Sequence, residues 1–268
     1  MSELRLRVIT SVVFSVTMVT LIMVSRWTTM LMCAFLAGIC AFELYRMLKS
    51  DANTPNLIIG ICTSVAFPVS YFFWHFNGVL TLTVTSVTVL LTWYVFTPKA
   101  RFTDVALTIF GAFYTGLMIS SLIGIREILP GNQGGLLVFG IVFSVWANDV
   151  CAYAIGSKFG KHKLAPRISP NKSYEGFFAG LVGSVAIWCL LAFIPGLELS
   201  LFWAIVGGLT TGFMGILGDL VESRIKRSTG FKDSGNLLPG HGGFLDRCDS
   251  LLVVAGVSSL FFRVLGMM

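Results

Sequence analysis

The chain alternates long apolar stretches with short polar ones. A bilayer core of about 30 Å is crossed by a helix of about 20 apolar residues. Nine stretches approach that length, over residues 8–24, 27–45, 57–76, 79–96, 105–125, 136–156, 176–194, 199–220 and 245–264. The pattern therefore predicts an all-α fold, a polytopic integral membrane helical bundle with about nine transmembrane helices.

The composition supports the same class. Of the 268 residues, 55% are hydrophobic and 12% charged, and the mean hydropathy is +0.84. Soluble domains carry about 25% charged residues, and disordered chains are poor in hydrophobic ones. Both classes are thus excluded. The six cysteines contain no CxxC pair and lie mostly in apolar runs, so we expect no disulfide framework.

The basic residues predict sidedness. With nine spans, 16 of the 19 lysines and arginines fall on the side of the N-terminus, and only Arg26, Arg126 and Arg263 fall opposite. Basic residues collect in cytoplasmic loops, so we place the N-terminus in the cytoplasm and the C-terminus outside. The net charge of +6 then reflects topology, and we expect no nucleic-acid partner.

The chemistry-bearing residues are unevenly distributed. Residues 1–135 (spans one to five) have the character of a transmembrane scaffold, and residues 136–268 (spans six to nine) that of a catalytic region. The second region contains two long cytoplasmic loops, 157–175 and 221–244, that are rich in charge, glycine and proline. We expect the chemistry in these loops because apolar spans offer few reactive groups.

Four aspartates lie in or beside the apolar stretches of the second region: Asp149, Asp219, Asp246 and Asp249. Acidic groups in a membrane are costly and indicate function by default. Asp246 and Asp249 are three residues apart and share one face of a helix, as do Asp219 and Glu222.

If the last two spans pack side by side, these carboxylates meet at the cytoplasmic boundary, where they repel one another unless protons or a cation intervene. Oxygen ligands without a usable His or Cys set favour Mg²⁺ or Mn²⁺ over zinc, and Asp219, Asp246 and Asp249 are the metal candidates. Simple ion pairs with Arg224, Arg227 or Arg247 are the alternative.

The segment between these spans combines phosphate donors with glycines. Four basic side chains suit phosphate oxygens: Lys226, Arg227, Lys232 and Arg247. Gly242 and Gly243 allow backbone N–H groups to approach an anion, and they precede the N-terminal end of the last span. Metal ligands and phosphate donors in one loop suit a polyphosphate bound with a divalent ion. The positive-inside rule explains the basic residues alone, but not the glycines or the acids.

The loop over 158–176 leaves two interpretations open. Ser173 can cap the following helix, or Ser169 and Lys172 can contact phosphate; the basic residues can equally face anionic lipid headgroups. Of the three histidines, His241 is the one we expect nearest a ligand, because it stands beside two glycines.

The residues of the last loop closely resemble the signature of the bacterial-type phosphatidate cytidylyltransferases (CDP-diacylglycerol synthases). The matching positions are Ser223, Ile225, Lys226, Arg227, Lys232, Asp233, Gly235, Leu238, Pro239, His241, Gly242, Gly243, Asp246, Arg247 and Asp249. The segments 146–149, 159–164, 168–170 and 218–219 are similar to that family too. Cys248 and Ser173-Tyr174 depart from its pattern, and residues before the second region resemble it only in hydropathy and length.

The resemblance implies that CTP and phosphatidate react to CDP-diacylglycerol and pyrophosphate in phospholipid biosynthesis, with a divalent cation. It implies a catalytic set, Asp219, Asp246, Asp249, Lys226 and Arg247. It also implies a substrate-binding set, Asp149, Lys172, Ser173, Ser223, Arg227, Lys232, Asp233, His241, Gly242 and Gly243. Expected partners are CTP, phosphatidate and membrane lipid. A second cation and a homodimer are compatible with the resemblance. The expected location is the bacterial inner membrane, with the site on its cytoplasmic side.

Two other functions remain open. A CTP-dependent kinase of the polyprenol or phytol type would transfer the γ-phosphate and release CDP. A transporter or flippase would use the intramembrane acids for ion coupling; such proteins often show internal repeats and midplane charges. Here no repeat is visible and the acids gather toward one face.

Overall fold

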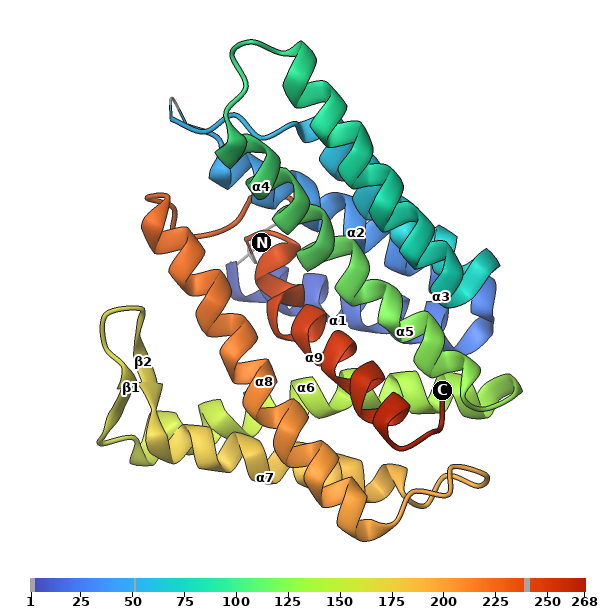
Figure 1. Cartoon of the computed structure of the whole chain (residues 1–268). Helices are drawn as coiled ribbons and strands as arrows, with labels where there is room; N and C mark the ends of the chain where they lie inside the picture. Colours follow the sequence, from blue (N-terminus) through green and yellow to red (C-terminus); the bar gives the residue numbers. More distant parts are fainter. Residues whose placement is uncertain (1–2, 51, 239–241) are drawn as a thin grey trace. The chain divides into compact units, whose positions relative to one another are not determined.

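The computed structural model describes residues 3–50, 52–238 and 242–268, with side chains from residue 8 onward. Helices dominate it (Figure 1). In chain order the elements are α1 (Glu3–Val24), α2 (Arg26–Leu48), α3 (Leu57–Phe96), α4 (Phe102–Ala112), a π-helical turn η1 (Phe113–Leu117), α5 (Met118–Glu127), α6 (Gly131–Phe159), β1 (Lys163–Ala165), β2 (Ser169–Ser173), α7 (Tyr174–Leu191), α8 (Leu201–Ser228) and α9 (Leu245–Val264).

The helices confirm the predicted class of an all-α integral membrane protein. Within the described residues, six are long and apolar enough to cross a bilayer, and α1 adds a shorter apolar stretch, Val8–Val24. The six are Arg26–Leu48, Leu57–Phe96, Phe102–Glu127, Gly131–Phe159, Tyr174–Leu191 and Leu201–Ser228. The count of nine spans and the orientation of the termini remain predictions.

The chain forms two compact units. The first contains Met1–Gly124 and Asp233–Cys248, and the second contains Ile125–Lys232 and Asp249–Met268. The signature is thus divided: its loop residues 233–248 (the signature loop) cluster with the N-terminal helices, whereas residues 223–232 and Asp249 belong to the second unit. The predicted division at residue 135 concerned roles in catalysis, which chain packing does not measure, and it remains a prediction.

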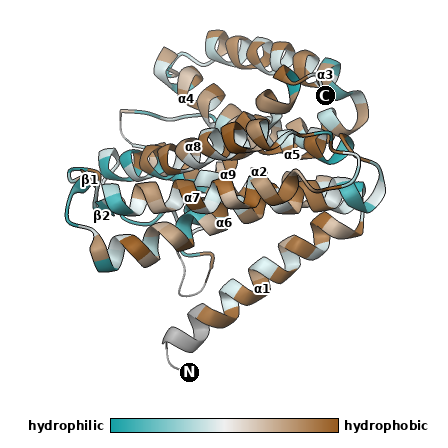
Figure 2. Ribbon diagram, turned by 90° about the horizontal axis from the view of Figure 1, so that it is seen from below, coloured by the Kyte–Doolittle hydropathy of each residue, from teal (hydrophilic) through white to brown (hydrophobic). Residues whose placement is uncertain are grey.

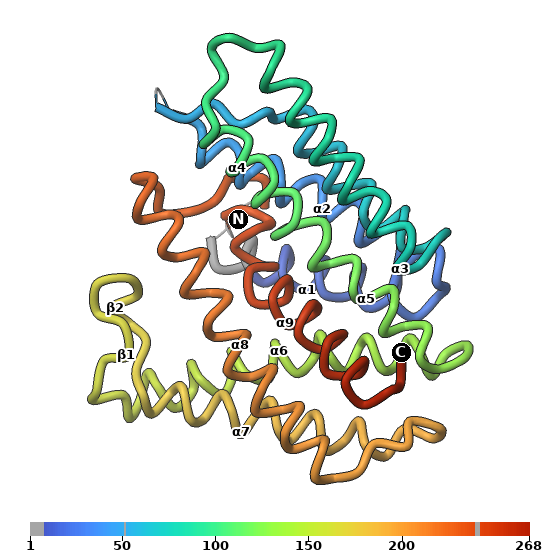
Figure 3. Tube along the Cα trace, in the orientation of Figure 1, coloured from blue at the N-terminus to red at the C-terminus, as the bar shows by residue number. Residues whose placement is uncertain are grey.

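In the first unit, α3 reverses direction at its midpoint. His75 has φ 49° and ψ −138°, which interrupts the helix between two predicted spans, 57–76 and 79–96. Gly78 lies so close to Ser70 that an added Cβ would be 2.4 Å from the Ser70 carbonyl oxygen. Eight residues of straight helix would cover about 12 Å, so the chain must turn back here. The reversal is visible along the tube of Figure 3.

Tyr45 organises the packing of α2 against α3 and α4. Its hydroxyl donates to the Thr108 carbonyl oxygen at 2.6 Å. A Cβ added at either Gly60 or Gly111 would lie 2.4 Å from the Tyr45 ring. Both helices therefore contact this ring at a glycine, where no side chain is in the way. Small residues at such crossings let helix backbones come close in a membrane.

In the second unit, α7 packs between α6 and α8, and the later part of α9 joins them. Asn148 on α6 donates from Nδ2 to the Gly212 carbonyl oxygen on α8 at 3.1 Å. Ser250 on α9 donates to the Gly215 carbonyl oxygen at 2.9 Å. The Trp188 ring is fully buried and stacks on Phe262. These contacts hold α8 beside α6 and α9.

The loop 157–175 contains a short hairpin that the hydropathy pattern did not predict. β1 and β2 pair antiparallel, with Lys163 opposite Ser173 and Ala165 opposite Ser169. The hairpin is among the most hydrophilic parts of its unit (Figure 2). Its base is held by the Tyr174 N–H, which donates to the His162 carbonyl oxygen at 2.9 Å, so β2 leads directly into α7.

Two glycines of α8 allow a matched test of this packing. A Cβ at Gly208 would lie 2.5 Å from the Val185 Cα, whereas one at Gly215 would meet side chains alone, a Val254 methyl group at 3.3 Å and the Ser250 Cβ at 4.0 Å. We expect Gly208→Ala to cost about 1–3 kcal/mol through overpacking against backbone, and Gly215→Ala to be nearly neutral because alanine also favours the helix. Thermal unfolding in detergent measures both; equal midpoints would contradict this view of the crossing.

Candidate functional site

A cavity of about 570 Å³ in the second unit gathers predicted site residues. It is lined by residues of α6, the hairpin, α7 and α8. Four of its lining residues were predicted to act on substrate or metal: Asp149, Lys172, Ser173 and Asp219. Further polar lining residues were not predicted: Asn148, Tyr153, Lys163 and Asn171.

An ion pair crosses this cavity. Lys172 Nζ on β2 lies 2.6 Å from Asp219 Oδ2 on α8, and both side chains are less than one-third exposed. The other Asp219 oxygen accepts a hydrogen bond from Ser223 Oγ one turn later, at 3.1 Å. The hairpin therefore brings a cation to the carboxylate that ends the eighth predicted span. Of the two interpretations of this loop, the contact shows Lys172 turned toward the predicted site.

Ser173 fulfils the capping role that its position suggested. It is buried, and its hydroxyl accepts the Gly176 N–H at 3.2 Å at the start of α7. Gly156 and Gly160 both approach this hydroxyl closely, which requires that they lack a side chain. At the base of the hairpin, His162 Nδ1 and Glu175 Oε1 are 2.7 Å apart. A contact of Ser173 with substrate remains a prediction.

Carboxylates gather around Asp249 in the same unit. Asp249 is partly buried, and the charges of Asp219, Glu222 and Asp149 act on it repulsively. Its own Oδ1 accepts the Ser250 N–H at 2.6 Å. Lys172 and Lys226 form ion pairs with Asp219 and Glu222, but no basic side chain among the described residues pairs with Asp249. The ion-pair alternative thus accounts for two of these acids, through lysines and not through the arginines considered.

The donor chemistry of this group fits a hard divalent cation. All its ligands are oxygens, and Asp219 already faces a positive charge in Lys172. Repulsion among the acids would be relieved by a cation. Within the described ranges, however, no three His, Cys, Asp or Glu side chains are arranged as a ready-made metal site. A metal would therefore need these side chains to rearrange.

In the first unit, Asp246 holds the signature loop together. Its Oδ2 accepts hydrogen bonds from the Ser234 N–H at 2.9 Å, the Ser234 hydroxyl at 2.9 Å and the Gly243 N–H at 2.8 Å. Leu238 and Gly242 form an antiparallel bridge, with the Leu238 N–H donating to the Gly242 carbonyl oxygen at 3.0 Å. Asp246 therefore shapes the loop, whatever it contributes to chemistry.

Glu43 on α2 is a second anchor of this loop, and the sequence analysis did not identify it. Its side chain is 1% exposed. It accepts the Phe244 N–H at 3.1 Å and the Leu245 N–H at 2.8 Å, and it shares the single proton of the Ser234 hydroxyl, 3.0 Å away, with Asp246. A carboxylate at a helix N-terminus satisfies amides that the helix leaves unpaired. The anion held by the first amides of α9 is thus the chain's own Glu43.

The loop glycines make this arrangement possible. A Cβ at Gly235 or Gly243 would lie about 2.5 Å from a Glu43 oxygen. Gly242 has φ +82°, a backbone conformation that residues with a side chain rarely adopt. A Cβ added there would lie 2.8 Å from Asp246 Oδ2. In the structure the Gly243 N–H and the two amides that follow it donate to protein carboxylates, Asp246 and Glu43. Phosphate contacts by Gly242 and Gly243 remain predictions.

The other predicted residues are distributed as follows. Ser223 bonds to Asp219, and Lys226 pairs with Glu222 one turn along α8. Three basic side chains, Arg227, Lys232 and Arg247, are exposed, as is Asp233. His241 lies outside the described residues. Glu43 had a signal in the sequence, because it is a lone acid inside a predicted span, but no motif or spaced partner accompanies it there.

Comparison with known proteins identifies relatives along nearly the whole chain. The model of a family described as "Cytidylyltransferase family" matches residues 5–265. The chain is 33% identical over 260 residues to the phosphatidate cytidylyltransferase of Bacillus subtilis (strain 168), covering 95% of this chain and 96% of that protein.

Two further relatives extend the comparison. The phosphatidate cytidylyltransferase of Staphylococcus haemolyticus (strain JCSC1435) is 32% identical over 255 residues, covering 94% of this chain and 96% of that protein. The chloroplastic phosphatidate cytidylyltransferase 4 of Arabidopsis thaliana is 33% identical over 247 residues, covering 83% of this chain and 63% of its own length.

Proposed function

Because this chain belongs to the cytidylyltransferase family, we propose that it transfers the cytidylyl group of CTP to phosphatidate, producing CDP-diacylglycerol and pyrophosphate. Its role would be in phospholipid biosynthesis. The observation that supports this best is the membership of nearly the whole chain in that family. The cavity with the Lys172–Asp219 pair adds a polar, charged site on a membrane protein.

The proposed reaction is a direct in-line transfer. A phosphate oxygen of phosphatidate attacks the α-phosphorus of CTP, the new P–O bond forms, and the bond to the β-phosphate breaks to release pyrophosphate. The attacking phosphate is already anionic at neutral pH, so no strong general base is required. The protein's main contribution is to align two polyanions and neutralise their charge.

The residues divide this work by their chemistry. Lys172, which lines the cavity, is proposed to hold a phosphate oxygen of CTP once Asp219 turns to a cation. The predicted phosphate contacts of Lys226, Arg227, Lys232 and Arg247 are retained in the proposal. So are the substrate contacts of Asp149, Ser173, Ser223, Asp233 and His241.

A divalent cation, Mg²⁺ or Mn²⁺, is part of the proposal. Asp219 and Asp249 would hold it, and Asp246, which precedes Asp249 by three residues, is the predicted third ligand. When bound, such an ion supplies charge neutralisation for the triphosphate. The carboxylate repulsion at Asp249 supports this assignment. A second cation is compatible with it.

We further propose nine spans with the N-terminus in the cytoplasm and the C-terminus outside, in the inner membrane of a bacterium. The asymmetry of basic residues supports this orientation. The site would lie at the cytoplasmic boundary, where CTP enters from water and the lipid enters from the leaflet. We also propose a homodimer, which the mass of the detergent-solubilised protein tests directly.

Labelled CTP tests the reaction. Purified protein in detergent is given phosphatidate and CTP labelled at the α- or the γ-phosphate, with and without Mg²⁺. We expect the α-label in the lipid and the γ-label in pyrophosphate, only when the metal is present. Entry of the γ-label into lipid would identify a CTP-dependent kinase instead. If neither label moves, the transferase proposal fails and transport becomes the question to test.

A further inference from the structure

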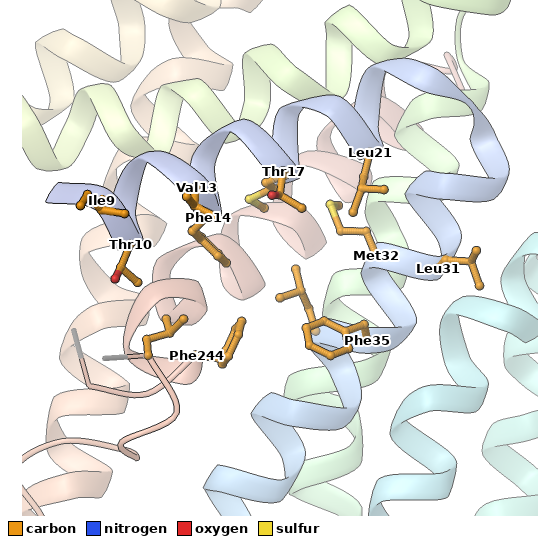
Figure 4. Close-up of a pocket in the computed structure, with 13 residues that line it drawn as sticks. Ile9, Thr10, Val13, Phe14, Thr17, Leu21, Leu31, Met32, Phe35 and Phe244 are labelled. Atoms are coloured by element: carbon orange, nitrogen blue, oxygen red, sulfur yellow. The ribbon is translucent and has the colours of Figure 1, made fainter. Parts of the chain in front are cut away.

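A second cavity, in the first unit, is almost entirely apolar. It has a volume of about 570 Å³ and is formed by α1, α2 and the signature loop. Figure 4 shows the side chains of α1 and α2 directed into a common space, with Phe244 on its far side. The lining residues are Ile9, Thr10, Val13, Phe14, Thr17, Met18, Leu21, Leu31, Met32, Phe35, Leu36, Leu238 and Phe244. None of them carries a charge.

The lining residues of α1 form one continuous stripe. They recur in pairs at intervals of four residues, from Ile9 and Thr10 to Leu21. Twelve residues of helix extend about 18 Å. One leaflet of a bilayer has about 15 Å of hydrocarbon, half of the full core. The groove therefore has the length of one extended lipid chain.

One residue joins this groove to the polar loop. The Phe244 ring lies 6.0 Å from the Phe14 ring and 5.8 Å from the Phe35 ring, measured between centroids. Its backbone N–H donates to Glu43, and two residues later Asp246 binds the loop amides. The groove thus borders a polar loop, which also carries the exposed basic side chain of Arg247. An occupant that is apolar along its length and polar at one end matches this surface.

We propose that this groove between α1 and α2 binds one acyl chain of the lipid substrate, with the lipid's phosphate end at the exposed basic side chain of Arg247 on the adjoining loop. The proposal rests on the proposed function, which supplies a diacyl phosphate as substrate. Burying apolar chain surface contributes affinity in proportion to the methylenes covered, which makes long-chain substrates bind better than short ones.

Two neighbouring positions on α1 offer a matched test. Thr17 lines the groove, whereas Val16 is 59% exposed and does not line it. Thr17→Trp would fill the middle of the groove, and Val16→Trp adds the same ring to the outer face. We expect Thr17→Trp to raise the KM for dipalmitoyl phosphatidate by about tenfold, the loss of about two methylenes. Its KM for dioctanoyl phosphatidate should rise less, because the shorter chain covers less of the groove beyond Phe14, and its KM for CTP should stay unchanged, as should all three values for Val16→Trp.

The short-chain substrate keeps the outcomes distinct. If Thr17→Trp loses both lipid activities equally, or if neither changes, the groove does not hold a substrate chain. A wild-type protein that makes no CDP-lipid would instead defeat the proposed function. A phosphatidate with a photoreactive diazirine in its acyl chain gives an independent measurement. Adducts on residues 9–21 and 31–36 are expected, and adducts spread over the outer face of α1 would overturn the proposal.

Discussion

Glu43→Ala is expected to remove nearly all CDP-lipid synthesis, although no part of the recognised signature includes this residue. The substitution leaves the Phe244 N–H and the Leu245 N–H without their buried acceptor, while the Ser234 hydroxyl keeps Asp246 Oδ2 as its acceptor. Each unsatisfied buried group costs about 1–3 kcal/mol. We expect turnover to fall by about two orders of magnitude, together with a lower unfolding midpoint in detergent.

A graded series separates the role of Glu43 from a general loss of fold. Glu43→Gln keeps one acceptor oxygen and nearly the same shape, so its turnover should lie between those of wild type and Glu43→Ala. Glu198→Ala removes an exposed carboxylate and should change neither turnover nor stability. If Glu43→Gln and Glu43→Ala both retain wild-type kcat, Glu43 does not position the loop. Mg²⁺ titration adds a readout, because a loop displaced around Asp246 should raise the metal concentration required.

The second large effect is expected from substitutions in the ion pair between Lys172 and Asp219, measured as kcat/KM for CTP. Asp219→Asn is expected to lower kcat/KM for CTP by about a thousandfold, because it removes a charge that the proposal assigns to the metal. Lys172→Met should lower it by about a hundredfold, through the lost phosphate contact. The two side chains are in contact at 2.6 Å, so the double variant should lose less than the product of the single losses.

The double-mutant cycle measures the coupling free energy between Lys172 and Asp219. Residues in one ion pair show coupling of about 1–3 kcal/mol, which is roughly fivefold to 150-fold in kcat/KM. Lys161→Met removes an exposed basic residue from the same loop and serves as the control. Strict multiplication of the two single effects would show that Lys172 and Asp219 act separately, and a Lys161→Met enzyme as impaired as Lys172→Met would point to bulk charge.

The membrane class and the family were readable from the sequence because they depend on local patterns. Apolar length predicts helices, and fixed polar spacing identifies the signature. The partner of Asp219 was not readable, because Lys172 lies 47 positions earlier and reaches it only through the β1–β2 hairpin. The basic residues of that loop satisfied a lipid-facing interpretation equally well.

Glu43 shows a different limit. The rule that intramembrane acids are functional applies to it as much as to Asp149, but Glu43 has no motif around it that indicates a role. Its three donors come from residues about 190 to 200 positions later, so only the packed first unit reveals what it binds. The contacts of Phe244 with Phe14 and Phe35 could not be predicted for a similar reason, since nothing in the spacing of these residues links them.

The reversal of α3 at His75 has a consequence for topology. A helix that doubles back ends near the level where it began, so α3 can supply two of the nine proposed spans. Two crossings would leave every later loop on the side that the proposal gives it. Counted as one crossing, it would send the basic loops on either side of it to opposite faces. Under the nine-span proposal, the geometry of a single residue, His75 with φ at 49°, thus allows the charged loops of this chain to share one aqueous compartment.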